Sequence, residues 1–150
     1  MLKISVFIII TILTGCGTVQ DYSSNVSIYK KHDSFTYSLT GQGYSNEMSE
    51  CRSEAEKNVF EVLLFRGLSG TDLQVPLVEN EKVSVDNNKK FYEDFFDKKK
   101  YRNFISSSVE FIENPKPIKD GYGCTVRFTV NLNSLKNNLE QNGIIRKFGL

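Results

Sequence analysis

Strict alternation of apolar and polar side chains predicts two half-buried β-strands in this chain. The first covers residues 34–44, where Phe35, Tyr37 and Leu39 face one way and hydroxyl side chains face the other. The second has an apolar side chain at every other position: Cys124, Val126, Phe128, Val130 and Leu132. This pattern is typical of an antiparallel sheet with one face in water.

Weaker patterns indicate two more strands, at residues 25–29 and 107–114. Proline has no N–H to donate to a strand ladder, so Pro115-Lys116-Pro117 is expected to end the second of these. Glycine inside a strand pattern often marks a bulge or a site where another backbone comes close. Gly41 and Gly43 therefore predict such a feature at the end of the 34–44 strand.

Apolar residues three and four positions apart predict the main helix at residues 46–66. The buried stripe consists of Met48, Cys51, Ala55, Val59 and Val62. Ser45 or Asn46 is expected to cap the N-terminus of this helix, and Gly67 is expected to end it. Ala55 is small, so we expect the helix to lie close to a sheet.

Further helical segments are predicted toward the C-terminus. Residues 68–85 form a long connection, a length that is uncommon unless the loop is functional or mobile. Residues 87–105 have a helical pattern again, divided in two by the lysine run at 98–100. A short last helix follows the best strand, with Asn133 or Ser134 as its N-cap.

This order of elements predicts an α+β fold, with helices packed on one face of a small antiparallel sheet. The polar, weakly periodic residues 16–33 are interpreted as an N-terminal tether, and residues 34–150 as a single domain. Residues 1–15, which precede the tether, have the pattern of a signal peptide that is removed from the mature protein.

The signal peptide is predicted from a positive start at Lys3, a short apolar run over 4–13 and small residues before Cys16. The apolar run is shorter than the roughly 20 residues needed to span a bilayer. Leu13-Thr14-Gly15-Cys16 resembles the bacterial lipobox, which implies cleavage before Cys16 and lipidation of that cysteine. Gly17 stands where an aspartate commonly signals inner-membrane retention, so we expect an outer-membrane anchor facing the periplasm. The inner membrane and the cell surface remain alternatives.

Composition narrows the classes of partner. Without its first 15 residues the chain retains 18 basic and 18 acidic residues, because Lys3 is the one charge removed. Binding of nucleic acid needs a surplus of positive charge, so no nucleic-acid partner is expected. The balanced charge also contains no polybasic signal for anionic lipids. The expected membrane contact is therefore made through the N-terminal lipid.

Candidate chemistry is sparse. The single histidine, His32, falls in the predicted tether and is interpreted as a solvated linker residue. The chain has no CxxC or HxxxH pair, so we expect no metal site and no cofactor. Gly41-Gln42-Gly43 lacks the third glycine of a dinucleotide-binding loop. Nothing in the sequence singles out a catalytic residue, and we expect no enzymatic activity.

Cys51 lies on the apolar stripe of the main helix and Cys124 on the apolar face of the best strand. If the helix packs on that strand, the two side chains meet across the core. In an oxidising compartment they can form a bridge that closes a loop of about 70 residues and stabilises the fold by roughly 4 kcal/mol. The alternative is a pair of buried free thiols that act as small hydrophobic side chains.

Two resemblances bear on function. A strand ending Gly41-x-Gly43, followed by a helix with Ala55 and Asn58-Val59-Phe60, resembles the domain of envelope lipoproteins related to the N-terminal domain of flagellar assembly protein T. A second, longer pattern comprises residues 60–67, Pro76-Leu77-Val78, Phe95-Phe96, Tyr101, Phe104-Ile105 and residues 139–149. This pattern is similar to lipoproteins of Bacteroidota-type envelopes, including the TssQ lipoproteins of type VI secretion systems. These resemblances imply an assembly role and supply no active-site residue.

The sequence thus predicts a structural or interaction component of a trans-envelope complex. Its expected partners are other envelope proteins. The contact region is placed in the long connection and its flanks, at Arg66, Gly67, Pro76, Leu77 and Val78. A second hypothesis is a ligand-binding lipoprotein in which residues 91–96 line an apolar pocket. An enzyme is the third.

Overall fold

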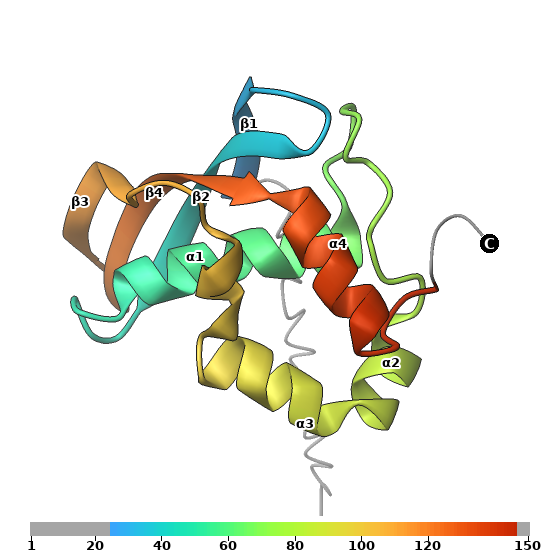
Figure 1. Ribbon diagram of the computed structural model, residues 1–150. Helices are drawn as coiled ribbons and strands as arrows, with labels where there is room; N and C mark the ends of the chain where they lie inside the picture. Colours follow the sequence, from blue (N-terminus) through green and yellow to red (C-terminus); the bar gives the residue numbers. More distant parts are fainter. Residues whose placement is uncertain (1–24, 147–150) are drawn as a thin grey trace, which may run out of the picture.

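A four-stranded antiparallel sheet in the order β1-β2-β4-β3 forms one layer of the computed structural model (Figure 1). The structure describes residues 25–146. The predicted signal peptide with Leu13-Thr14-Gly15, the predicted lipidation site Cys16 and the first half of the predicted tether lie outside the described residues. The four strands are β1 (Val26–Lys31), β2 (Thr36–Ser45), β3 (Glu110–Ile118) and β4 (Gly121–Asn131).

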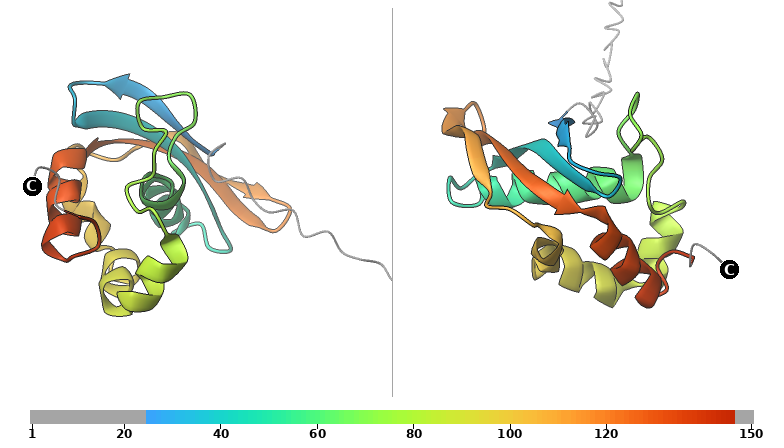
Figure 2. Two further views of the ribbon diagram at one scale, coloured as in Figure 1. Left: turned by 90° about the vertical axis from the view of Figure 1, so that its right-hand side faces the viewer. Right: turned by 45° about the horizontal axis from the view of Figure 1, so that its top comes forward.

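The helices lie on one side of this sheet, as the two views of Figure 2 make plain. They are α1 (Cys51–Glu61) with its π-helical extension η2 (Val62–Arg66), α2 (Glu81–Asn87), α3 (Lys89–Tyr92), the π-helical η3 (Glu93–Asp97), the 3₁₀ turn η4 (Lys100–Phe104) and α4 (Leu132–Gln141). The predicted α+β class, with helices on one face of a small antiparallel sheet, is confirmed.

The two strongly alternating strands are the central pair of the sheet. In the register of β2 and β4, Leu39 is opposite Phe128 and Tyr37 is opposite Val130. Residues directly opposite each other in an antiparallel pair share a face, so all four enter the core, and each is at most 2% exposed. Phe60 of α1 packs on these four side chains, with its ring centroid 6.2 Å from that of Phe128.

The close approach predicted at the two glycines is confirmed. A Cβ at Gly41 would lie 2.5 Å from Cγ2 of Val59 and 2.9 Å from the carbonyl oxygen of Ala55, both on α1. The small side chain of Ala55 is fully buried at this contact. Because glycine has no Cβ, the helix packs against the backbone of β2 rather than against its side chains.

The domain begins earlier than predicted. Part of the predicted tether, residues 16–33, is strand β1, which pairs with β2 and places Val26 opposite Gly41. Val26 is only 5% exposed and belongs to the core. The alternation in this segment is broken by a register shift between Ile28 and Lys30, which explains why its strand pattern was weak.

Two helix starts also differ from prediction. The main helix begins at Cys51, and Met48, expected on its buried stripe, lies in the preceding turn and is 52% exposed. Glu50 rather than Ser45 or Asn46 occupies the N-cap position. For α4 the cap is Asn131, whose side chain accepts a hydrogen bond from the backbone N–H of Ser134, so Asn133 and Ser134 lie inside the helix.

The prolines at 115 and 117 do not end β3, which continues to Ile118. Among the residues that the structure describes, β3 pairs with β4 alone, and an edge strand can accept residues that lack an N–H. The register shifts between Glu113 and Lys116, which accommodates the first proline. The helical region from residue 87 is divided at Lys99, whose φ is 56°, inside the lysine run where the break was predicted.

Candidate functional site

The single histidine belongs to the sheet rather than to a linker. His32 lies just after β1, and its Nε2 is 2.7 Å from Oγ of Ser38. A serine bonded to an imidazole is the pair used in nucleophilic catalysis. However, Ser38 is only 8% exposed and its hydroxyl also lies 2.8 Å from Oγ1 of Thr129. We find no acidic side chain hydrogen-bonded to the other ring nitrogen among residues 25–146, so the contacts tie the hairpin to the sheet.

Metal ligands do not gather within the described range. No group of three or more His, Cys, Asp or Glu side chains in residues 25–146 is placed to hold a metal ion. Across the same residues, no helix has both the length and the apolar character needed to cross a membrane.

The predicted contact loop is fastened to the domain at both ends. Leu77 and Val78 donate backbone hydrogen bonds of 3.1 and 2.8 Å to carbonyls of η2. Gly67 and Val78 are buried, and Gly67 has a φ of 70°, which only glycine adopts readily. Pro76 and Leu77 are half-buried. The structure therefore does not bring the five predicted residues together into one exposed surface.

Arg66 is exposed, and its guanidinium is 2.5 Å from the carboxylate of Glu81, the first residue of α2. In the middle of the loop, Asp72 bonds the Lys31 ammonium and accepts a 2.7 Å hydrogen bond from the hydroxyl of Tyr37. Lys31, and then Tyr37, lower the pKa of the Asp72 carboxyl. The most exposed apolar side chain of the loop is Val75, at 74%, which the sequence did not single out.

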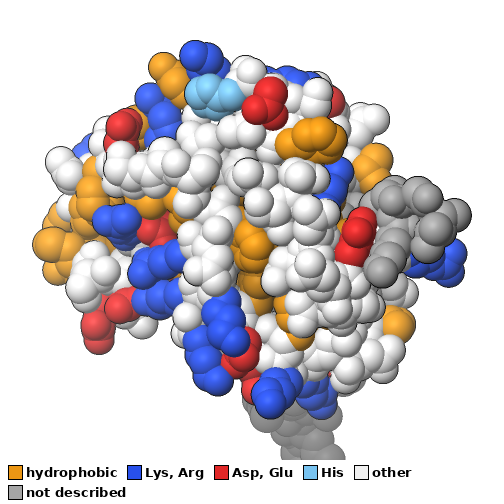
Figure 3. Space-filling view, in the orientation of Figure 1, with side chains coloured by type: hydrophobic (Ala, Val, Ile, Leu, Met, Phe, Trp, Pro, Cys, Tyr) orange, Lys and Arg blue, Asp and Glu red, His pale blue; other side chains and the backbone are white. Residues whose placement is uncertain are grey.

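Exposed apolar side chains gather instead along β3. Phe111, Ile112 and Ile118 are 40%, 44% and 46% exposed. Figure 3 shows hydrophobic side chains at the left margin of the molecule, over this edge of the sheet. Sequence reasoning missed the surface because it predicted a strand at residues 107–114 without assigning its faces and ended that strand at the prolines. The isolated, irregular pattern of residues 109–118 was the available signal.

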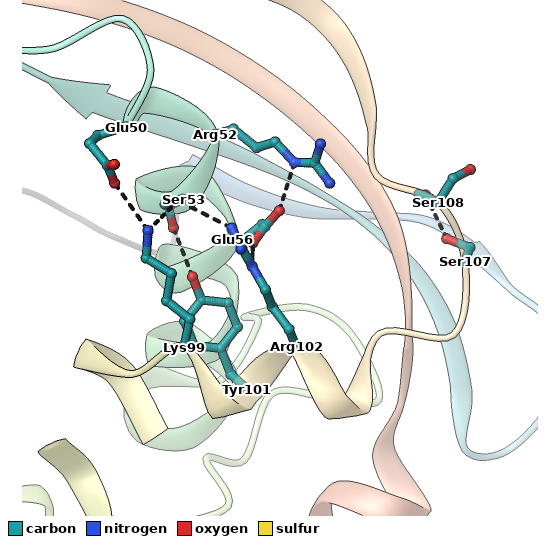
Figure 4. A network of polar contacts seen from close by, with 9 residues as sticks. All are labelled: Glu50, Arg52, Ser53, Glu56, Lys99, Tyr101, Arg102, Ser107 and Ser108. Atoms are coloured by element: carbon teal, nitrogen blue, oxygen red, sulfur yellow. Dashed lines mark hydrogen bonds and ion pairs between the residues drawn. The ribbon is translucent and has the colours of Figure 1, made fainter. Parts of the chain in front are cut away.

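A buried carboxylate joins α1 to η4 (Figure 4). Glu56 has no exposed surface, and its two oxygens accept hydrogen bonds from Nε of Arg52 at 2.9 Å and Nε of Arg102 at 2.6 Å. Ser53 extends the network, since its Oγ is 2.9 Å from Nζ of Lys99 and 3.1 Å from Nη2 of Arg102. Every buried charge here has a partner, as a stable interior requires.

Cys51 and Cys124 are joined by a disulfide, with Cα atoms 6.1 Å apart and a sequence separation of 73. Both are buried, one at the first residue of α1 and the other on the inner face of β4. Of the two alternatives that the sequence left open, the structure has the bridge. Together with the Glu56 network, this bond fixes the helical layer to the sheet.

Only part of the aromatic run lines a hollow. Tyr92 and Phe96 pack against Phe65, at centroid distances of 5.7 and 6.3 Å. Phe91 and Phe95 border a hollow of ≈ 320 Å³ that also involves residues far along the chain. Its other lining residues are Phe104 and the polar residues Lys90, Asp94, Lys100, Asn103, Asn138 and Asn142. The predicted pocket of residues 91–96 is thus partly present, with a polar rim.

Comparison with known proteins found no matching family model, no matching curated protein and no matching solved structure.

Proposed function

We propose that this protein is a lipid-anchored component of a bacterial envelope complex, in which the α+β domain faces the periplasm and binds other envelope proteins. The anchor is the lipidated Cys16, after removal of residues 1–15, and the membrane is the outer one. The resemblance to lipoproteins of type VI secretion systems makes such a machine the first candidate for the complex.

The observation that carries the proposal is the exposed edge strand. Phe111, Ile112 and Ile118 are each at least 40% exposed on a strand with one open side. These side chains lie along one edge strand rather than in a single compact patch, and apolar side chains exposed along an open edge indicate an interaction site, because their exposure to water is unfavourable. Pro115, Pro117 and the register shifts disrupt a regular ladder on the open side, so we expect the contact to be made by side chains.

The interior is built to hold this edge in one orientation. β3 is bonded to β4, and β4 is joined to α1 through Cys51–Cys124. The Glu56 network ties α1 to η4 from the other side. A binding surface that is held in one conformation by the elements beneath it loses less conformational entropy when a partner binds.

Crosslinking in intact cells tests the proposal. The full-length protein with a C-terminal tag is crosslinked and purified, and the co-purified proteins are identified. We expect a defined set of envelope-complex subunits, and we expect the paired change Phe111→Ser and Ile118→Ser to abolish their recovery. Val75→Ser, at the exposed tip of the loop, is the matched control and should leave recovery unchanged.

Two outcomes contradict the proposal in different ways. Loss of the partners with Val75→Ser but not with the β3 changes moves the contact to the loop. Recovery of the protein alone, while a known envelope complex crosslinks well, removes the assembly role.

The anchor is tested separately by metabolic labelling with a palmitate analogue. Label is expected on the wild-type protein and lost on Cys16→Ser, with the labelled protein sedimenting in the outer-membrane fraction. Label retained on Cys16→Ser, or none on the wild type, contradicts lipidation at Cys16.

A further inference from the structure

The hollow between η4 and α4 has an aromatic floor. Phe91 and Phe95 are nearly parallel, with centroids 5.6 Å apart and planes at 24°. Phe95 and Phe104 continue the series at 6.0 Å and 23°. In Figure 3 a strip of hydrophobic side chains is visible at this place, near the centre of the molecule, with polar surface on both sides.

The rim contains three carboxamides from two regions of the chain. Asn103 comes from η4, Asn138 from α4 and Asn142 from the turn after α4. Asn142 donates a 2.8 Å hydrogen bond from Nδ2 to the carbonyl oxygen of Asn138. Within residues 25–146 the side chains of Asn103 and Asn138 make no hydrogen bond, so their donors and acceptors are available.

The charges at the rim are largely engaged. Asp94 lies 2.5 Å from Nζ of Lys100 and 2.6 Å from Nζ of Lys98. The two ammonium groups, with Lys100 first, lower the pKa of Asp94 to about 2, so this carboxylate stays ionised and paired. Lys90 is the other cationic residue that lines the hollow. The hydrogen-bonding groups left for a ligand are therefore the neutral amides and, at the edge, the exposed Lys90 ammonium.

From this combination we propose that the hollow binds a neutral saccharide of one or two pyranose rings. A carboxamide offers both a donor and an acceptor, as does each sugar hydroxyl, so the two groups match in pairs. Phe95 is stacked between Phe91 and Phe104, and Phe95 and Phe104 are only 2% and 8% exposed, so the apolar contact with a pyranose falls to Phe91, the partly exposed ring of the floor. The volume of ≈ 320 Å³ is at the small end of the range for ligand pockets, which suits a ligand of this size.

The site is independent of the β3 edge, because none of its lining residues comes from a strand. Loss of saccharide binding therefore leaves the proposed assembly role untouched, and the reverse also holds. An extended peptide is the competing ligand, since its backbone can also pair with carboxamides. It differs from a saccharide in having no array of hydroxyl groups.

Saturation-transfer NMR on the full-length protein tests the proposal. The probes are N,N′-diacetylchitobiose, cellobiose and maltose, with the tripeptide Ala-Leu-Ala as the competing chemistry. We expect transfer from the aromatic protons of the protein to the ring C–H protons of at least one disaccharide. The double change Asn103→Ala and Asn138→Ala should weaken this binding at least tenfold.

Asn137→Ala is the matched control, since Asn137 is an exposed residue of the same helix that does not line the hollow. It should bind as the wild type does, and thermal unfolding of all variants checks that each is folded. Absence of transfer to every sugar at millimolar concentration overturns the proposal. So does transfer to the tripeptide alone, or sugar binding that the double variant leaves unchanged.

Discussion

Gly43 of β2 lies against Ala55 of α1 so closely that a Cβ at position 43 would be 2.5 Å from the backbone nitrogen of Ala55. Gly43 is also directly opposite Cys124 in the β2–β4 register. The helix can therefore descend onto the sheet at the very point where Cys51 reaches Cys124. Absence of a side chain at one residue determines how the two layers meet.

Gly43→Ala is accordingly expected to destabilise the domain by about 2–3 kcal/mol, because overpacking at a backbone contact forces the two layers apart. Urea unfolding followed by circular dichroism measures this change. The control is Gly123→Ala, on the same sheet, where the nearest atom to the new Cβ is a side-chain carbon of Tyr44 at 3.3 Å. The control should change the free energy of unfolding by less than about 1 kcal/mol. Equal effects of the two substitutions would contradict the close approach.

Reduction of Cys51–Cys124 is expected to lower the free energy of unfolding by about 4 kcal/mol, given the 73-residue separation. The measurement is urea unfolding with and without reductant, repeated on the double change Cys51→Ala and Cys124→Ala. The double variant should be insensitive to reductant, which separates loss of the bond from other effects. Two free thiols in the denatured, unreduced protein purified from the envelope would show that the bond is absent there.

Replacing both arginines around Glu56 is expected to lower the free energy of unfolding more than replacing either one alone. Arg52 and Arg102 have 45% and 44% of their side-chain surface exposed, whereas Glu56 has none. Arg102→Met alone leaves Arg52 to pair with the carboxylate, and we expect a loss of about 1.5–3 kcal/mol. Removing both leaves an unpaired buried charge, for which about 3–5 kcal/mol is typical.

Adding Glu56→Gln to that double variant should restore part of the stability, because the buried charge disappears while a hydrogen-bonding group remains. Chemical denaturation of the wild type, Arg102→Met, the double arginine variant and that variant with Glu56→Gln measures the effect. If Glu56→Gln destabilises the double variant further, the carboxylate is not buried as an ion in that background.

The carboxyl of Asp94 should titrate near pH 2, since its pKa is lowered from 3.8 to about 2 by Lys100 and then Lys98. A lowered pKa means that the folded state binds this proton less readily than the unfolded state. The contribution to stability is therefore present above about pH 3.8 and is lost as the pH falls toward 2. Carbon-detected NMR of the side chain gives the midpoint. In Lys100→Gln the midpoint should rise, and an unchanged midpoint would contradict the pairing.

Periodicity was sufficient for the central part of the fold. The alternation of β4 marked Cys124, Val126, Phe128 and Val130 as buried, and all four are in the core. The same reasoning placed Cys51 and Ala55 on the inner face of the main helix. These segments have strong patterns because their inner residues are fully buried and their outer ones face solvent.

The edges of the sheet could not be predicted in the same way. β1 and β3 have one strand neighbour each and contain register shifts, so their side chains do not alternate cleanly. The exposed surface on β3 was missed for this reason. The polar rim of the hollow was missed because it combines Asn103 with Asn138 and Asn142, which come together only through the packing of α4 on η4.

β1 also determines how the domain responds to mechanical load. It follows directly on the N-terminal segment, and within residues 25–146 its one strand neighbour is β2. Tension along that segment acts first on the pairing of Val26 with Gly41. The six residues of β1 can detach and release about 20 Å of chain while the disulfide-bonded layers stay closed. In the proposed lipid-anchored protein, β1 would thus yield first when the anchor moves relative to the partners.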